Sequence, residues 1–107
     1  MATSDKDWQR ARELHPILVQ RFLNSFFSEV DSITQNRGTD LRSPYRDLYK
    51  LISERDKLIP ELFEGMTHSN MWVRVLSWKR HGLLTKDEER TFTFEIQEAL
   101  RKVSVDR

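Results

Sequence analysis

Apolar residues recur at intervals of three and four along most of the chain, the spacing of a helix that buries one side. The first such segment spans residues 4–36, and its apolar positions are Trp8, Ala11, Leu14, Leu18, Phe22, Phe26, Val30 and Ile33. Pro16 interrupts this pattern, because an interior proline lacks the N–H of a helical hydrogen bond and clashes with the preceding turn. We therefore expect one long helix that is either kinked or split at Pro16, with Ser4 or Asp5 as its N-cap.

A second helix is predicted to begin at Ser43-Pro44, because serine as the N-cap followed by proline at the first helical position is a strong start signal. Its apolar positions are Tyr45, Leu48, Tyr49, Ile52 and Ile59. Pro60 is expected to bend or end this helix. One further turn would then close at Gly65.

The segment 70–81 is the most apolar helical stretch of the chain. At about 100° per residue, its large apolar side chains cover more than half of a helical wheel; they are Met71, Trp72, Val73, Val75, Leu76 and Trp78. Such a helix must be covered on two sides, by other helices of the same chain or by a second copy. Ser69 is the expected N-cap, and Gly82 marks the end of the helix.

The last segment, residues 85–103, opens with a capping-box spacing between Thr85 and Glu88. A four-residue stripe follows, made of Phe92, Ile96, Leu100 and Val103, and Phe94 lies off that stripe. Leu83 and Leu84 precede the cap and are expected to fill the space between the last two helices. Helix, glycine, capping box and helix together predict an antiparallel pair.

No segment has the pattern of a strand, and the connections are short. The sequence therefore predicts an all-α fold, a small antiparallel (up-and-down) helical bundle of four main helices. Residues 1–107 are expected to form a single helical domain, with residues 1–4 as a flexible N-terminus. Because the first helix looks about twice as long as the others, its excess length would project beyond a four-helix core. That projection favours a second chain or an orthogonal packing.

Composition narrows the classes of function. The 107 residues include 18 Lys and Arg, 17 Asp and Glu, and no cysteine, for a formal net charge of +1. The balance argues against a dedicated polyanion binder, and the absence of cysteine excludes disulfides and thiolate metal sites. No apolar run is long enough for a bilayer, and the polar, acidic N-terminus is unlike a signal peptide. We expect a cytoplasmic protein with no membrane partner.

The residues of a catalytic site do not gather in recognisable spacings. The three histidines, His15, His68 and His81, lack a histidine partner four residues away. Glu64 and His68 are four residues apart, but Gly65 at the predicted helix end separates them. There is no glycine-rich phosphate loop and no nucleophile elbow. The sequence predicts no enzyme, no catalytic residue, no metal site and no cofactor.

The central segment also carries a local excess of positive charge, since no acidic residue stands between Glu64 and Asp87. It therefore supplies the candidate residues for binding a partner or an anion, which are Trp72, Arg74, Trp78, Lys79, Arg80 and His81. Tryptophan and arginine dominate the energetics of many interfaces. The simpler interpretation is a core helix with a solvated basic edge.

These patterns predict a small regulatory or adaptor-type helical protein that acts by protein–protein interaction and forms a homodimer. The alternative is a nucleic-acid-binding protein that contacts the phosphate backbone through Arg74, Lys79, Arg80 and Lys86. A helix-turn-helix is disfavoured, because the acidic run 87–89 would have to enter a groove lined by phosphates.

Overall fold

The computed structural model describes residues 4–106, and helices are the only regular elements within that range. In chain order they are α1 (Asp5–Gln35), α2 (Arg42–Phe63), α3 (Met71–Arg80), α4 (Lys86–Glu89) and α5 (Phe94–Arg101). The predicted all-α fold, a small helical bundle, is confirmed. The prediction of a flexible segment 1–4 falls mostly on residues outside the described range; Ser4, which lies inside it, caps α1.

α1 is one continuous helix of 31 residues with Pro16 inside it, so the prediction of a split at Pro16 is wrong. Proline removes only the hydrogen bond to the carbonyl of Arg12. Both Pro16 and Arg12 lie on the exposed side of the helix, whereas Leu14 and Leu18 on either side of the proline are fully buried. Packing of these two leucines holds the helical path across the missing bond.

α2 begins earlier and ends later than predicted. Leu41 occupies the N-cap position, so the prediction of a Ser43 cap is wrong, and the Asp40 carboxylate accepts from the Arg42 N–H at 3.0 Å. The helix continues through Pro60 to Phe63. Gly65 follows with a φ of 68°, a left-handed conformation that favours glycine and ends the turn as predicted.

α3 ends in the motif that its glycine predicts. The N–H of Gly82 (φ 70°) donates to the carbonyl of Lys79 at 3.0 Å, and the N–H of Leu83 donates to the carbonyl of Trp78 at 2.9 Å. This pair of bonds is a Schellman motif. The N-cap is Asn70 rather than the predicted Ser69.

The predicted last helix is interrupted and forms two helices, so residues 4–106 contain five helices, of which α4 is a single turn. The Thr85–Glu88 capping box forms as predicted, but α4 ends after four residues. The chain then turns so that Phe92 enters the core, and α5 starts at Phe94.

The break between α4 and α5 is fixed by Asp7, near the start of α1. Its carboxylate is only 3% exposed, and it accepts from the Thr93 N–H at 2.8 Å and the Thr93 hydroxyl at 2.6 Å. The Ser4 hydroxyl donates a third bond at 2.9 Å. A buried carboxylate with three donors is fully satisfied, and it joins the N-terminal ends of α1 and α5.

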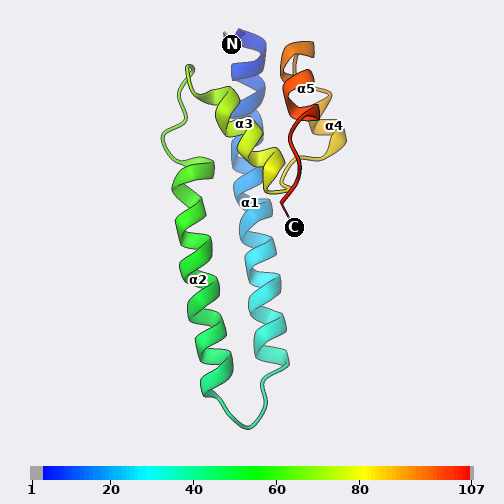
Figure 1. Ribbon diagram of the computed structural model, residues 1–107. Coiled ribbons are helices and arrows are strands. Elements are labelled where there is room, and N and C mark those ends of the chain that lie inside the picture. Colours follow the sequence, from blue (N-terminus) through cyan, green and yellow to red (C-terminus); the bar gives the residue numbers. More distant parts are fainter. Residues whose placement is uncertain (1–3, 107) are drawn as a thin grey trace.

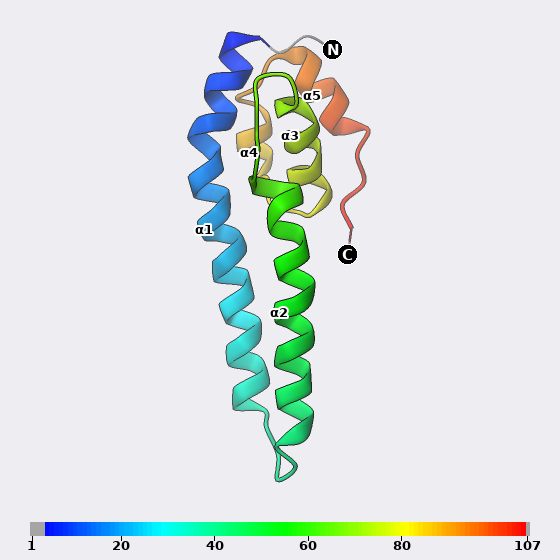
Figure 2. The ribbon, with the colours of Figure 1, turned by 90° about the vertical axis from the view of Figure 1, so that its left-hand side faces the viewer.

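The molecule has two parts, visible in both views of the ribbon (Figures 1 and 2). α3, α4 and α5 pack with the N-terminal half of α1 and the C-terminal end of α2; we call this part the head. The remaining lengths of α1 and α2, residues 23–56, continue as an antiparallel pair without a third helix beside them, and we call this pair the arm. The principal extents are 55 × 24 × 20 Å, so the molecule is elongated along the arm.

The buried core lies in the head and at its border with the arm. Its largest fully buried side chains are Trp78, Phe92, Leu14, Leu18, Leu62 and Met71. On α1 the fully covered stripe ends at Phe22. Beyond it, the predicted core positions Phe26, Val30 and Ile33 are only half-buried, because only α2 covers them.

Candidate interaction surface

Trp78 is a core residue. Its side chain is 0% exposed, and its Nε1–H donates to the carbonyl oxygen of Leu62 at 2.8 Å. His15 and Phe63 lie near it, and the His15 and Trp78 ring centroids are 6.3 Å apart. The two-sided cover that the sequence requires for this helix therefore comes from the same chain at Trp78, which presents no surface to a partner.

Arg74 binds the end of α2. Its two terminal nitrogens donate to the carbonyl oxygens of Glu61 and Glu64, the latter at 3.0 Å. The last carbonyls of a helix have no partner within the helix and form the negative end of its dipole. A guanidinium there satisfies two hydrogen-bond acceptors, and its positive charge interacts favourably with the helix dipole.

Further side chains cap the neighbouring carbonyls. The Nε2 of His15 lies 2.7 Å from the Phe63 oxygen, and since a carbonyl can only accept, Nε2 carries the proton. The amide of Asn70 donates to the Gly65 oxygen at 3.0 Å. Together with Trp78 and Arg74, these residues satisfy five consecutive carbonyls, those of residues 61–65. Polar side chains of α1 and of α3 with its N-cap thus hold the end of α2 in place.

The other predicted site residues do not share one open face. Trp72 is half-buried against the core. The ammonium of Lys79 lies 2.9 Å from Glu89, with both side chains largely buried, so it joins α3 to α4. His81 is half-buried at the C-cap of α3, and Arg80 is exposed. The structure therefore does not gather Trp72, Arg74, Trp78, Lys79, Arg80 and His81 into a binding site, and their binding role stays a prediction.

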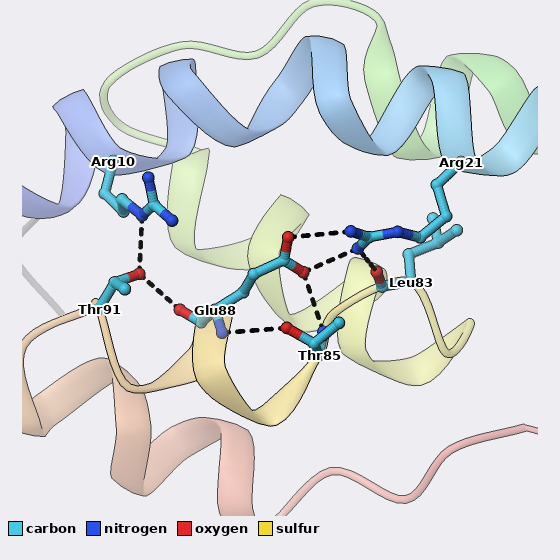
Figure 3. A network of polar contacts seen from close by, with 6 residues as sticks. All are labelled: Arg10, Arg21, Leu83, Thr85, Glu88 and Thr91. Carbon is cyan, nitrogen blue, oxygen red and sulfur yellow. Dashed lines mark hydrogen bonds and ion pairs between the residues drawn. The ribbon is translucent and has the colours of Figure 1, made fainter.

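A second ion pair joins α1 to α4 (Figure 3). The guanidinium of Arg21 donates to both carboxylate oxygens of Glu88, at 2.7 and 3.0 Å, and to the Leu83 carbonyl at 2.5 Å. The hydrogen bond from Arg21 holds the pKa of Glu88 below its usual range, against the opposing effect of burial. The same carboxylate accepts from the Thr85 N–H at 2.9 Å. The capping box and the ion pair thus use one glutamate.

A shallow groove of about 330 Å³ runs between α4 and α5, with Phe94 exposed at its edge. Three of its four cations have carboxylate partners: Lys79 pairs with Glu89, Arg90 with Asp87 and Arg101 with Glu98, while Lys86 has no ion-pair partner among residues 4–106. The groove therefore offers little unpaired charge to a ligand.

The largest group of exposed apolar side chains lies on the arm. We call it the apolar face, and its most exposed members are Phe27 (58%), Leu41 (62%), Tyr45 (71%), Tyr49 (69%) and Ile52 (53%). Half-buried Leu23 and Val30 lie in the same row of α1 as Phe27. Contiguous exposed apolar patches of this kind are rare on monomers and mark sites of interaction.

The rows on α1 and α2 lie on the same side of the arm. Each residue advances about 100° around a helix. On α1, the row that contains Phe27 is rotated away from the row that faces α2. On α2, the row that contains Tyr49 is rotated in the same sense away from the row that faces α1. Two antiparallel helices are related by a two-fold axis between them, so equal rotations bring both rows to one side. Figure 1 shows this antiparallel arrangement.

The opposite side of the arm is polar. Its exposed positions are Ser25, Glu29 and Ser32 on α1 and Asp47, Lys50 and Glu54 on α2. Glu29 pairs with Arg55 at 2.7 Å. The arm is therefore amphipathic as a unit, with one face suited to water and the other to a further layer of helices.

The sequence pattern places Tyr45, Tyr49 and Ile52 on one apolar stripe but does not show that this stripe is exposed, so the apolar face was missed. The signal that could have found it was the excess length of the first helix, since the part of α2 that pairs with this length has nothing else to cover it.

No helix of the described residues 4–106 is long and apolar enough to cross a membrane. Within the same range, no three histidine or acidic side chains gather closely enough to hold a metal ion. Comparison of the chain with protein-family models, curated proteins and solved structures finds no match.

Proposed function

We propose that this chain is a protein–protein interaction module that works without catalysis and that binds its partner through the apolar face of the arm. The observation that carries the proposal is the exposure of Phe27, Tyr45 and Tyr49 together on one side of a helix pair. Tyrosine and phenylalanine are enriched in the buried centres of interfaces, because they bury much area for few rotatable bonds. A regulatory or adaptor role fits a module whose head is rigidly packed and whose arm projects.

The polar face supplies a matched control for this proposal. Tyr49→Lys adds one positive charge at the centre of the apolar face, and Ser32→Lys adds the same charge on the opposite, polar face. Both positions are exposed, so neither substitution removes core packing.

The test is capture of proteins from a nuclease-treated lysate of the producing cells, with the tagged full chain as bait. We expect the wild type and Ser32→Lys to retain the same protein, which can be a further copy of the chain, and Tyr49→Lys to lose it. Capture that is unchanged by Tyr49→Lys, or no captured protein at all, would overturn the proposal.

Binding to nucleic acid has less support. Two of its four expected cations, Arg74 and Lys79, hold partners within the chain, which leaves Arg80 and Lys86 exposed. Two exposed cations give a weak, salt-sensitive contact.

A further inference from the structure

From the geometry of the arm we infer that the partner of the apolar face is a second copy of this chain, and that two arms pack antiparallel about a two-fold axis into a four-helix bundle. This inference rests on the proposed function, and it identifies the partner that the apolar face binds. Two antiparallel helices with a shared apolar face form half of such a bundle, and an identical pair supplies the other half.

The area of the apolar face fits a dimer. At their observed exposures, Phe27, Tyr45 and Tyr49 present on the order of 400 Å² per copy, about half of the roughly 800 Å² that each partner contributes to a standard interface. Leu41, Ile52 and the exposed parts of their half-buried neighbours add to that area.

The position of the face leaves room for a second arm. Phe27 and Leu18 point to opposite sides of α1, because they are separated by about two and a half helical turns. Leu18 is buried in the head, so α3 and α5 lie on the side of α1 away from Phe27. Phe27 lies about two turns before the end of α1, and Tyr49 lies about two turns after the start of α2. Both residues are therefore near the middle of the arm, where a two-fold axis brings each close to its own copy.

The charges on α2 favour the antiparallel orientation. Arg42, Tyr49 and Asp56 follow one another at seven-residue intervals, so they share one line along the helix. With the two-fold axis at Tyr49, Arg42 of one copy lies opposite Asp56 of the other, and the pair occurs twice. Both side chains are exposed, and neither has an ion-pair partner among residues 4–106.

The parallel orientation lacks this match. Lys6, Glu13 and Gln20 continue the line of Phe27 into the head at seven-residue intervals, and all three are exposed. Parallel arms would place the two heads at the same end and lay this polar line against the partner. Antiparallel arms overlap only along the apolar length and leave the heads at opposite ends.

Sedimentation equilibrium of the full chain and its variants tests the inference. We expect a dimer for the wild type and for Ser32→Lys. Tyr49→Lys places two like charges at the centre of the interface and should raise the dissociation constant by about a hundredfold or more. Tyr45→Lys, at an equally exposed position, should act in the same direction if the first variant folds poorly.

A charge exchange tests the orientation. Arg42→Asp and Asp56→Arg should each weaken the dimer by about tenfold, because each replaces two attractive pairs by two repulsive ones. The double variant restores opposite charges and should recover the affinity of the wild type. A double variant as weak as the single ones would overturn the antiparallel arrangement.

If the wild type is a monomer, the inference that the partner is a second copy of this chain is overturned. If Tyr49-dependent capture of a different protein persists in that case, the proposed function stands and only its partner is wrong. If neither dimer nor Tyr49-dependent capture is found, both proposals fall. A wild-type dimer that Tyr49→Lys and Tyr45→Lys leave intact would place the interface elsewhere on the molecule and also overturn the inference.

Discussion

Replacing Trp78 by phenylalanine measures how strongly the central helix holds the end of α2. The substitution removes the Nε1–H that bonds the Leu62 carbonyl and leaves a buried acceptor without a partner. An unsatisfied buried polar group costs about 1–3 kcal/mol. The smaller ring also leaves unfilled volume in a site that is fully enclosed, and loss of buried volume adds about 1–2 kcal/mol.

We therefore expect Trp78→Phe to lower the free energy of unfolding by about 2–5 kcal/mol. Urea denaturation followed by far-ultraviolet circular dichroism measures this change, with the variants held at one protein concentration because association contributes to stability. The slope against urea should stay the same, since the area exposed on unfolding hardly changes.

Trp72→Phe serves as the control, because Trp72 lies on the same helix but is only half-buried. It should lose less than half as much stability. A loss below about 0.5 kcal/mol for Trp78→Phe, within the range of ordinary surface substitutions, would refute the assignment of Trp78 as a structural anchor.

Three further predictions concern other contacts of the head. Because Arg21 lowers the pKa of Glu88 in the folded state, the pair contributes its full stabilisation at pH values above the usual carboxyl range, and this stabilisation disappears as the pH falls through the lowered pKa. The free energies of unfolding of wild type and Glu88→Gln should therefore differ at neutral pH and converge in acid. A difference that stays constant with pH would contradict the linkage. Gly82→Ala should cost about 1–2 kcal/mol because of the left-handed backbone, whereas Gly38→Ala, with open space around it, should be nearly neutral in the same assay. Arg74→Lys should lower the thermal midpoint, because an ammonium lacks the planar fork that reaches two carbonyls; an unchanged midpoint would show that the two bonds contribute little.

Local signals in the sequence predicted most element boundaries to within a few residues. The four-residue stripe of α1, the Thr85–Glu88 capping box and the turn at Gly82 depend on neighbours within one or two turns. The early end of α4 depends instead on Asp7, which is 86 residues from Thr93 in the chain. No periodicity carries information over that separation.

The sequence prediction placed the candidate surface on α3, whereas the exposed apolar side chains gather on α1 and α2, and the difference has a related reason. Periodicity shows which side of a helix is apolar but not what covers it. Trp78 is covered within the chain, and Tyr45 and Tyr49 are not, although all three occupy apolar stripes. The basic residues of α3 were likewise read as free charges, whereas Arg74 meets the end of another helix. Only the three-dimensional arrangement decides these partners.

The contact between Asp7 and Thr93 also orders the events of folding. Contacts between distant residues form slowly, and a chain made from its N-terminus folds its early segments first. α1 and α2 are complete, and can pair, before Thr93 has been synthesised. Ser4 is available to Asp7 from the start, but the two donors of Thr93 come only with the α4–α5 segment, so the head cannot close before that segment has been made. A nascent chain that stops before residue 93 therefore lacks both donors of Thr93 and leaves the Asp7 carboxylate at the edge of an unfinished core.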